Sequence, residues 1–420
     1  MKSVIKQILA IGLLLSTSSS EGTDWGRFRG PNGSGVATAG KIPVDYVKTD
    51  AVWETTVDGN GNSSPIIAGG NVYLTVAEIK ENTKEGARSL LAYSLRTGKL
   101  QWKVTSEFTT FKTNKRNGFA SASPCADQDG VYVLWQSERG SELKAFDHEG
   151  RKRWEYEIGA FGAGTGAATS PIVYDSVVLL SHDNENYESF LLAVSAKDGS
   201  RIWQTGRKTQ RTGYATPAVF KTSDGQTQVV FSHSYEGVVG VDFETGKIVW
   251  QNVVFGEHTQ RAVGSPIVAG DQVIAASGFT NGIRTLVSLK PDRVNGLHEA
   301  SEHFRTTRNV PHCPTPLVLE SNLYCWTDRG ILACLDLNTG KQKWLARVGG
   351  EYFSSPIALG RRILCIDRNG TIVVVGAGDQ YQELGRSELE VGVMATPGLT
   401  EDAIIIRTEN SVMRFDLEKN

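Results

Sequence analysis

The segment TPLVLESNLYCWTDRGILACLDLNTGKQKWL, residues 315–345, contains four short apolar runs separated by turn residues. The runs begin at Pro316, Leu323, Ile331 and Gln342, and the turns between them contain Asn, Asp and Gly. Short apolar runs bounded by such residues are typical of β-strands joined by tight hairpins. The segment therefore predicts one small antiparallel sheet of four strands.

The start of this unit recurs along the chain. A Ser-Pro or Thr-Pro pair opens a short apolar run eight times, with prolines at Pro65, Pro124, Pro171, Pro217, Pro266, Pro316, Pro356 and Pro397. Proline cannot donate to a sheet ladder, so it suits the first residue of a strand. Successive spacings of 59, 47, 46, 49, 50, 40 and 41 residues are typical of propeller blades.

A second marker lies at the end of the unit, where Gly precedes Trp by four residues. The Gly permits a positive φ in the turn, and the Trp can cover a large apolar area. We expect these tryptophans to pack between neighbouring blades and to have no catalytic role. The predicted structural set is Trp102, Trp154, Trp203, Trp250 and Trp344, which have this Gly, together with Trp53 of the N-terminal strand, which does not.

The last unit ends at Asn420 without a fourth strand, whereas Val52–Val57 is a spare strand that carries Trp53. Pairing the two would remove two open sheet edges. The sequence therefore predicts an all-β fold: an eight-bladed β-propeller of four-stranded antiparallel blades, closed by the N-terminal strand. We expect it to be a single domain over residues 51–420, because no linker interrupts the period.

The first residues read as an export signal. Lys2 and Lys6 precede the apolar run Ile8–Leu15 and the small residues Ser16–Ser20. We expect a signal peptide over 1–20, a leader over 21–50 and a periplasmic or secreted protein. The mature chain should have no transmembrane segment. Because no Cys lies near the cleavage point, we do not expect a lipid anchor. With 44 Lys+Arg and 46 Asp+Glu, the chain is a poor candidate for nucleic-acid binding.

The Ser/Thr-Pro opening, an Ala-x-Asp strand and the Thr-Gly-Lys-x-x-Trp ending resemble the repeats named for pyrroloquinoline quinone (PQQ). Trp25–Gly35 also resembles the leader of exported PQQ-like proteins of planctomycete-type bacteria. The resemblance implies kinship with two groups: quinoprotein dehydrogenases, which hold PQQ and calcium at the axis, and BamB-like lipoproteins, which bind partner proteins without a cofactor. Fold alone does not choose between them.

Candidate binding residues lie where the chain leads into each blade. This face also carries the long loops, over 77–86, 108–120 and 182–189, and loops on a rigid scaffold commonly bind ligands. A ring of Asn, Arg, Tyr and His could hold an anionic or peptide ligand. The alternative is a solvated channel mouth lined by turn residues whose hydrogen bonds are already satisfied. The predicted ligand-binding residues are Asn117, Arg211, Tyr214, Arg261, His312 and Tyr352, with Asn60 and Asn62 nearby.

Two functions remain open. The first is a non-catalytic propeller that binds a protein, peptide or polysaccharide partner and needs no cofactor. The alternative is a PQQ- and calcium-dependent oxidoreductase acting on alcohols or sugars, which needs several oxygen ligands for calcium and a catalytic base. Glu351 and Glu390 are the nearest acids, and neither a vicinal Cys pair nor a haem-attachment motif is present. We assign no catalytic or metal-binding residue.

Three smaller features leave alternatives. Cys325 and Cys334 flank a turn that would place them opposite each other, as a disulfide or as two buried thiols. Asp183–Asn186 could be a calcium loop, but an exposed turn fits its spacing better. His182 and His233 occupy similar places in adjacent blades, as a paired site or as a product of repeat similarity.

Overall fold

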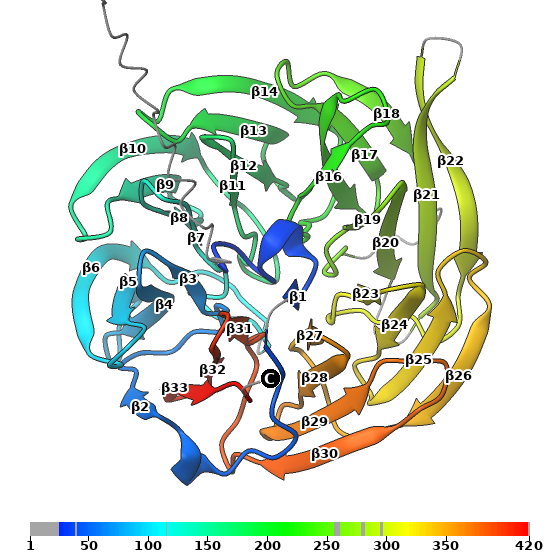
Figure 1. Ribbon diagram of the computed structural model, residues 1–420. Helices are drawn as coiled ribbons and strands as arrows, with labels where there is room; N and C mark the ends of the chain where they lie inside the picture. The colour runs from blue at the N-terminus through cyan, green and yellow to red at the C-terminus, as the bar shows by residue number, and fades with distance from the viewer. Residues whose placement is uncertain are drawn as a thin grey trace, which may run out of the picture.

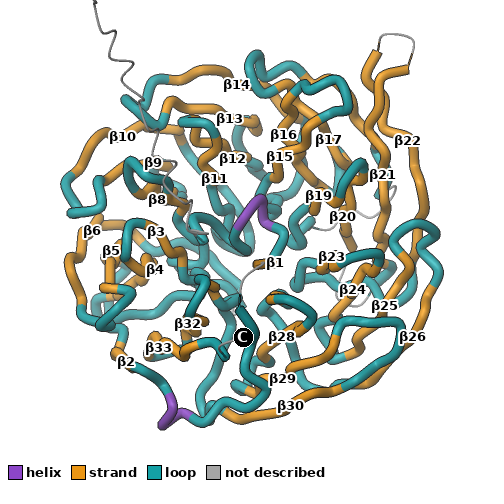
Figure 2. The backbone as a smooth tube through the Cα atoms, viewed as in Figure 1, coloured by secondary structure: helices purple, strands orange, loops and turns teal. Residues whose placement is uncertain are grey.

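Eight small sheets surround a central axis in the computed structural model, which describes residues 25–37, 40–114, 116–255, 261–278, 282–294 and 297–418 (Figure 1). The expected signal peptide, residues 1–20, lies outside the described residues. Only two short 3-10 helices, η1 (Pro31–Gly33) and η2 (Lys48–Asp50), interrupt the strands of this part of the chain (Figure 2). None of its helices has the length and apolarity that crossing a membrane requires. The eight-bladed, all-β prediction is confirmed.

Each blade is a meander whose first strand lies nearest the axis. Blade 1 comprises β3 (Ile66–Ala68), β4 (Asn71–Ile79), β5 (Glu85–Ser94) and β6 (Leu100–Thr109), and blade 2 comprises β7 (Cys125–Ala126), β8 (Val131–Trp135), β9 (Ser141–Phe146) and β10 (Lys152–Gly159). Blade 3 comprises β11 (Ile172–Tyr174), β12 (Val177–His182), β13 (Ser189–Ser195) and β14 (Arg201–Arg207), and blade 4 comprises β15 (Ala218–Lys221), β16 (Thr227–His233), β17 (Gly237–Asp242) and β18 (Ile248–Asn252).

The second half repeats this layout. Blade 5 comprises β19 (Ile267–Ala269), β20 (Gln272–Gly278), β21 (Arg284–Val294) and β22 (Leu297–Thr306), and blade 6 comprises β23 (Leu317–Leu319), β24 (Asn322–Trp326), β25 (Ile331–Asp336) and β26 (Gln342–Arg347). Blade 7 comprises β27 (Ile357–Leu359), β28 (Arg362–Ile366), β29 (Thr371–Gly376) and β30 (Glu383–Glu388), and blade 8 comprises β31 (Gly398–Leu399), β32 (Ala403–Arg407), β33 (Ser411–Asp416) and β2 (Trp53–Thr56).

The ring closes as the sequence predicts. Strand β2 pairs antiparallel with β33, with Trp53 opposite Arg414 and Thr56 opposite Ser411. The last blade thus takes its outermost strand from the start of the propeller, and both edges that an open array would expose are covered.

The tryptophans join neighbouring blades. The indole N–H of Trp102 donates to the backbone oxygen of His148 at 2.8 Å, and that of Trp154 donates to Ala196 at 2.9 Å. Equivalent bonds run from Trp53 to Leu95, from Trp203 to Phe243 and from Trp344 to Gly378. A Cβ at Gly150 would lie 2.7 Å from the indole of Trp102, in a turn where φ is +84°. The Gly therefore provides both the turn and the space for the preceding blade's Trp.

Trp250 differs, because blade 5 lacks the short turn that would receive it. Its indole N–H bonds Gln228 Oε1 within its own blade at 2.7 Å. Strands β21 and β22 instead form a long hairpin, whose ladder runs through Pro291 opposite Ala300 and reaches outward past the ring (Figure 1). Asn252 of blade 4 bonds the backbone oxygen of Ala300 at 2.9 Å, so this hairpin covers blade 4.

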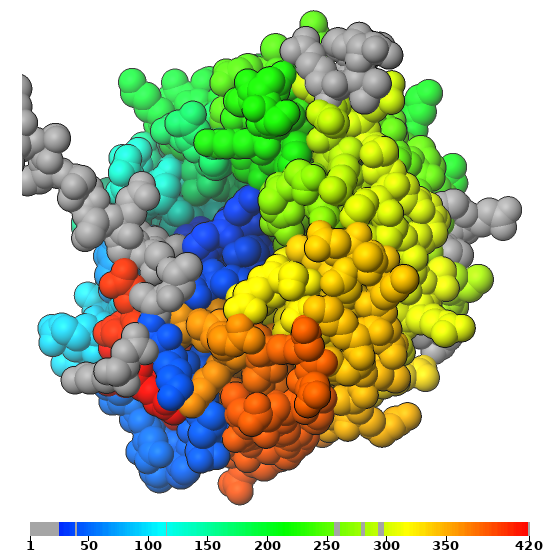
Figure 3. Space-filling model, turned by 45° about the vertical axis from the view of Figure 1, so that its right-hand side comes forward, coloured from blue at the N-terminus to red at the C-terminus, as the bar shows by residue number. Residues whose placement is uncertain are grey.

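The N-terminal segment Trp25–Gly35, called the plug below, fills one end of the axis. Figure 3 shows this blue segment at the centre of the ring, between blades far apart in sequence. Its backbone oxygens at Trp25, Gly26 and Gly35 accept N–H bonds of 2.7–3.0 Å from blades 1, 2 and 7. Asn32 adds a reciprocal pair of bonds to the backbone of Val219 in blade 4, and the following strand β1 (Val36–Ala37) lies parallel to β27.

The expected pairing of Cys325 with Cys334 is wrong by one residue. The turn is centred on Arg329, so Cys325 lies opposite Ala333 and Cys334 lies opposite Tyr324. A shift of one residue turns a side chain to the other sheet face. The two thiols therefore lie in different hydrophobic clusters, and both are free.

Candidate binding site on the propeller axis

The Ser or Thr before each of the eight blade prolines belongs to one ring around the axis, called the hydroxyl belt. Within it, a backbone N–H donates to the side-chain oxygen of the next blade's member, as from Ser64 to Ser123 at 2.9 Å and from Thr396 back to Ser64 at 3.1 Å. Seven such bonds of 2.9–3.1 Å are present, and Thr216 is the member whose hydroxyl accepts none. The belt comprises Ser64, Ser123, Ser170, Thr216, Ser265, Thr315, Ser355 and Thr396.

The Ser-Pro and Thr-Pro pairs that mark the strand starts also supply this ring of hydroxyls, which the sequence predictions do not include. A hydroxyl residue at the same place in all eight units was the available signal. One hydroxyl before one proline says little. Eight of them in a closed repeat must meet at the axis.

A cavity of about 330 Å³ lies on the axis, bounded by the whole belt. Phe28 of the plug also lines it, so the plug closes the cavity from below. On the side of the long loops the lining includes Val263, Phe353 and Met394 together with polar groups. The site thus combines apolar contacts with a few polar groups, as small-molecule and peptide sites do. The predicted residues that line it are Asn62, Asn117, Tyr214, Arg261 and His312.

Two buried arginines of the plug lie beneath the belt. Arg27 bonds the backbone oxygen of Pro217, and Arg29 bonds those of Pro316 at 2.9 Å and Pro356 at 3.2 Å. These prolines directly follow three members of the belt. Burial lowers the pKa of Arg27 to about 10 and that of Arg29 to about 9. Each cation therefore lies within the protein, held by carbonyl dipoles.

The wall nearest blades 2 to 4 is held by side-chain hydrogen bonds. The Tyr214 hydroxyl lies 2.5 Å from Thr165 Oγ1 and donates to the backbone oxygen of Gly166 at 2.9 Å. Asn117 donates to the backbone oxygen of Thr165 at 3.0 Å. These bonds fix Asn117 and Tyr214 relative to Thr165 and Gly166. Burial raises the pKa of Tyr214.

Arg261 forms the charged part of this wall through an ion pair with Glu185. Burial alone would raise the pKa of Glu185, but the backbone N–H of Gly164 at 3.1 Å and the Arg261 guanidinium outweigh it, so the pKa is lowered. Arg211 Nη1 lies 3.9 Å from the same carboxylate but its side chain is about half exposed. Arg211 is not among the residues that line the cavity.

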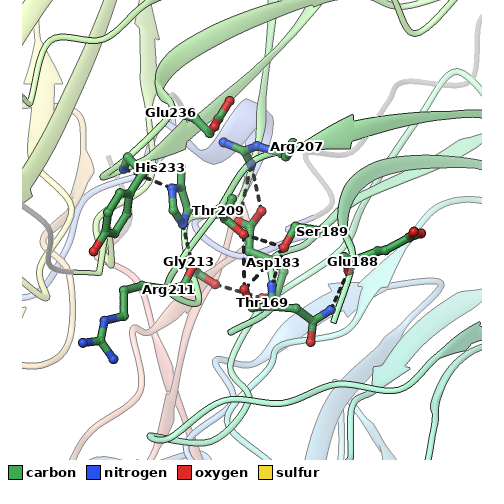
Figure 4. Close-up of polar contacts among 12 residues, drawn as sticks. Thr169, Asp183, Glu188, Ser189, Arg207, Thr209, Arg211, Gly213, His233 and Glu236 are labelled. Carbon is green, nitrogen blue, oxygen red and sulfur yellow. Dashed lines mark hydrogen bonds and ion pairs between the residues drawn. The ribbon is translucent and has the colours of Figure 1, made fainter. Parts of the chain in front are cut away.

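Glu185 is not among the predicted site residues, because the sequence interpretation of Asp183–Asn186 is an exposed turn. That interpretation is wrong for Asp183 and Asn184. Asp183 and Asn184 are each 1% exposed. Figure 4 shows the Asp183 carboxylate pointing toward Arg207, whose Nη1 lies 3.2 Å and 3.4 Å from its two oxygens. Asn184 bonds Ser189 and the backbone oxygen of Glu188. A buried ion pair thus anchors the loop that presents Glu185.

His182 and His233 each support the lead-in of their own blade and form no paired site. His233 Nε2 lies 2.8 Å from the backbone oxygen of Arg211 (Figure 4), and His182 Nε2 lies 3.2 Å from that of Ala160. Burial lowers the pKa of both rings. The repeat explains their similar positions.

Blade 6 presents His312 and Cys313 to the cavity. Their backbone N–H groups donate to the Asp328 carboxylate at 2.8 Å and 3.0 Å, and Arg284 pairs with the same carboxylate. Burial lowers the pKa of His312, and burial together with Asp328 raises the pKa of Cys313. Burial thus disfavours the charged form of both side chains, and a protonated thiol is a poor nucleophile.

Besides Arg211, two more predicted residues lie away from the cavity lining. Tyr352 is 1% exposed and packs against Trp326, with ring centroids 5.3 Å apart. Its lead-in segment instead presents Phe353 to the cavity. Asn60 bonds the backbone of Ala77 and also lies outside the lining.

The lining does not fit a calcium–quinone centre. Calcium prefers six to eight oxygen ligands with carboxylates among them, yet none of the described residues that line the cavity is Asp or Glu. Nor do the described residues contain any group of three His, Cys, Asp or Glu suited to a metal. Glu351 pairs with Arg116 and Arg368 at the rim, and Glu390 is exposed.

Comparison with known proteins agrees with the repeat analysis. A family model described as "Outer membrane protein assembly factor BamB" matches residues 15–165 and 86–302, which together are more than half of the chain. The chain belongs to this family. It is a PQQ-like propeller of the BamB type.

Two relatives share the BamB name. The protein from Yersinia pestis is 24% identical over 285 residues, 66% of this chain and 56% of the relative's length. The protein from Moranella endobia (strain PCIT) is 23% identical over 305 residues, 69% of this chain and 72% of the relative. This chain thus matches little more than half of the Yersinia protein.

Two solved structures share the fold. BamB from Moraxella catarrhalis superposes with a TM-score of 0.61 at 15% identity, covering 87% of this chain and all but 1% of the other. A europium-containing methanol dehydrogenase gives 0.50 at 10% identity, over 95% of this chain and 99% of the other. At these identities the likeness concerns the fold alone, so the dehydrogenase is a fold relative of this BamB-type chain.

Proposed function

We propose that this chain is an exported, non-catalytic propeller that binds a protein, or a peptide segment of one, at the face of the long loops. The asymmetry of the axis carries the proposal. The plug fills one end, whereas the other end holds a cavity with apolar and polar walls beneath the loops. Loops on a rigid scaffold around such a cavity suit recognition.

The family supports a protein partner, because relatives carry the name of an outer membrane protein assembly factor. We accordingly place this chain outside the cytoplasm, working with other proteins of the cell envelope. No comparison favours a polysaccharide partner. The likeness of the plug to the planctomycete-type leader stays a prediction.

Site-specific photo-crosslinking tests the proposed face. Tyr187 lies in the loop between β12 and β13 and is 52% exposed, while Leu345 lies on the outermost strand β26 and is 49% exposed. Each is replaced by a photo-reactive phenylalanine derivative in the cells that make the protein. We expect one discrete protein adduct from position 187 and none from position 345.

Adducts from position 345 alone, or none from either position in folded protein, would overturn the proposal. The non-catalytic part has its own test, a titration with PQQ and calcium. A saturable absorbance change together with dye reduction on addition of an alcohol or sugar would contradict it.

A further inference from the structure

The hydroxyl belt has unused donors. Seven of its side-chain oxygens already accept a backbone N–H, so each hydroxyl can still donate its own proton. In the described part of the chain these hydroxyls donate to no protein acceptor. All of them line the cavity and are at most 5% exposed. The axis therefore holds a ring of O–H groups that lacks acceptors.

Positive charge lies directly beneath this ring. Arg27 and Arg29 are 8% and 0% exposed, and their guanidinium groups bond carbonyl oxygens. No described carboxylate pairs with either of them, and the Nε of each has no hydrogen-bond partner. Unpaired buried cations create a strong positive potential, because the surroundings screen them poorly.

The rim adds two further cations. Arg261 lines the cavity, and its Nε has no partner although its terminal nitrogen pairs with Glu185. Arg116 also lines the cavity, with its guanidinium 5.5 Å from the Phe353 ring. Arg116 shares Glu351 with Arg368, and Arg261 shares Glu185 with Arg211. Four arginines therefore face two carboxylates at the mouth.

We propose that the axial cavity is a carboxylate-binding site, in which belt hydroxyls and Arg261 hold the anionic group and the apolar walls hold the carbon chain attached to it. The lining offers many donors and no acidic side chain, which is the complement of a carboxylate. The inference deepens the proposed function, on which it rests, because the C-terminus of a partner peptide is one source of this group. A free small organic acid is the other.

Thermal unfolding with defined probes tests the site. The probes are succinate, a tripeptide with a free C-terminus and the same tripeptide as its C-terminal amide, each up to about 10 mM, since binding to the folded state raises the melting temperature. We expect a saturable rise with at least one carboxylate and none with the amide. Succinate alone would indicate a free acid, and the tripeptide acid alone would indicate a chain end.

Matched variants locate the effect. Arg261→Gln should reduce the affinity for the carboxylate probe at least about tenfold, because the charge-assisted pair between Arg261 and the carboxylate is lost. Thr216→Val should reduce this affinity about threefold. The substitution leaves the seven belt bonds intact, because the Thr216 hydroxyl accepts none of them. Arg151→Gln is the control, since Arg151 is 76% exposed on the outer rim.

No saturable rise with any probe would overturn the site, as would equal rises with acid and amide. Unchanged affinity in both cavity variants would do the same. The crosslink at Tyr187 does not depend on the cavity, so the protein-binding proposal and the carboxylate site can fail separately.

Discussion

The two ends of the propeller axis are built from the same repeats but are used differently. At the plug end, backbone and side chains of Trp25–Gly35 bond carbonyl and N–H groups of five blades. Three buried donors of the plug, the indole N–H of Trp25 and the Nε of Arg27 and of Arg29, have no partner among the described residues, but they lie in a packed segment. At the loop end, the eight belt hydroxyls and the Nε of Arg261 also have unused donors, and these residues line a cavity. Unsatisfied buried donors are costly, and beside a cavity they can be satisfied by a ligand or water. The comparison separates the part of the axis that holds the ring from the part available for binding.

The largest effect that tests this comparison should come from a methyl group added to the plug. A Cβ at Gly30 would lie 2.2 Å from the Trp25 indole, at a φ of +63°. Gly30→Ala should lower the free energy of unfolding by about 3 kcal/mol, from backbone strain together with overpacking. Urea denaturation measures it.

Gly118 at the loop end is the matched control. A Cβ there would meet its nearest atom, Ser121 Oγ, at 3.8 Å. Gly118→Ala should change the free energy of unfolding by less than about 1 kcal/mol. Similar losses in the two variants would show that the two ends do not differ in rigidity.

An intermediate effect is expected within the belt. Thr315→Val removes the acceptor for the buried N–H of Ser265, which lies 3.0 Å from Thr315 Oγ1. Leaving that N–H unpaired should cost about 1–3 kcal/mol. Thr216→Val removes a hydroxyl that accepts no belt bond, so its cost should be smaller. If the denaturation curves have equal slopes and Thr216→Val loses more unfolding free energy than Thr315→Val, the assigned role of the belt bonds is wrong.

The smallest effect should be a loss of folding stability on acidification, caused by three buried histidines near the loop face. Burial lowers the pKa of His182, His233 and His312 below the ordinary 6.5, so the unfolded chain takes up protons more readily than the folded one. Their contribution to stability is complete above about pH 6.5 and is lost as pH falls below it.

Denaturation midpoints at pH 7 and pH 5 measure this contribution. The double variant His182→Gln, His233→Gln should lose less stability between the two pH values than the natural chain. His303→Gln is the control, because His303 is exposed on β22. A pH dependence that is the same in all three proteins would show that the buried rings do not cause it.

The period of the repeats was enough to predict the ring, because the proline marker recurs in all eight units and the Gly-x-x-x-Trp marker in five of them. The spare N-terminal strand that carries Trp53 was enough to predict how the ring closes. Local patterns were less informative where the outcome depends on register or on distant partners. Because the hairpin turn is centred on Arg329, Cys325 and Cys334 miss being opposite each other by one residue. Asp183 is buried because it pairs with Arg207, which lies two strands further along the chain.

The candidate site was predicted in part, for a related reason. Lead-in segments do meet at the axis, so Asn117, Tyr214, Arg261 and His312 line the cavity. Within a lead-in, however, sequence does not say which neighbour turns inward, and Phe353 lines the cavity while Tyr352 is buried against Trp326. Nor could the plug be placed, since its partners belong to blades spread over the whole chain.

The pairing of β2 with β33 has a consequence for how this chain reaches its final form. Synthesis delivers Trp53–Thr56 long before Ser411–Asp416, and Arg29 must wait for Pro356, 327 residues later. Contacts of such high sequence separation form slowly. The nascent protein therefore carries an unpaired strand and a loose N-terminal segment until its last blade arrives, a period in which a chaperone that covers strand edges would have most to protect.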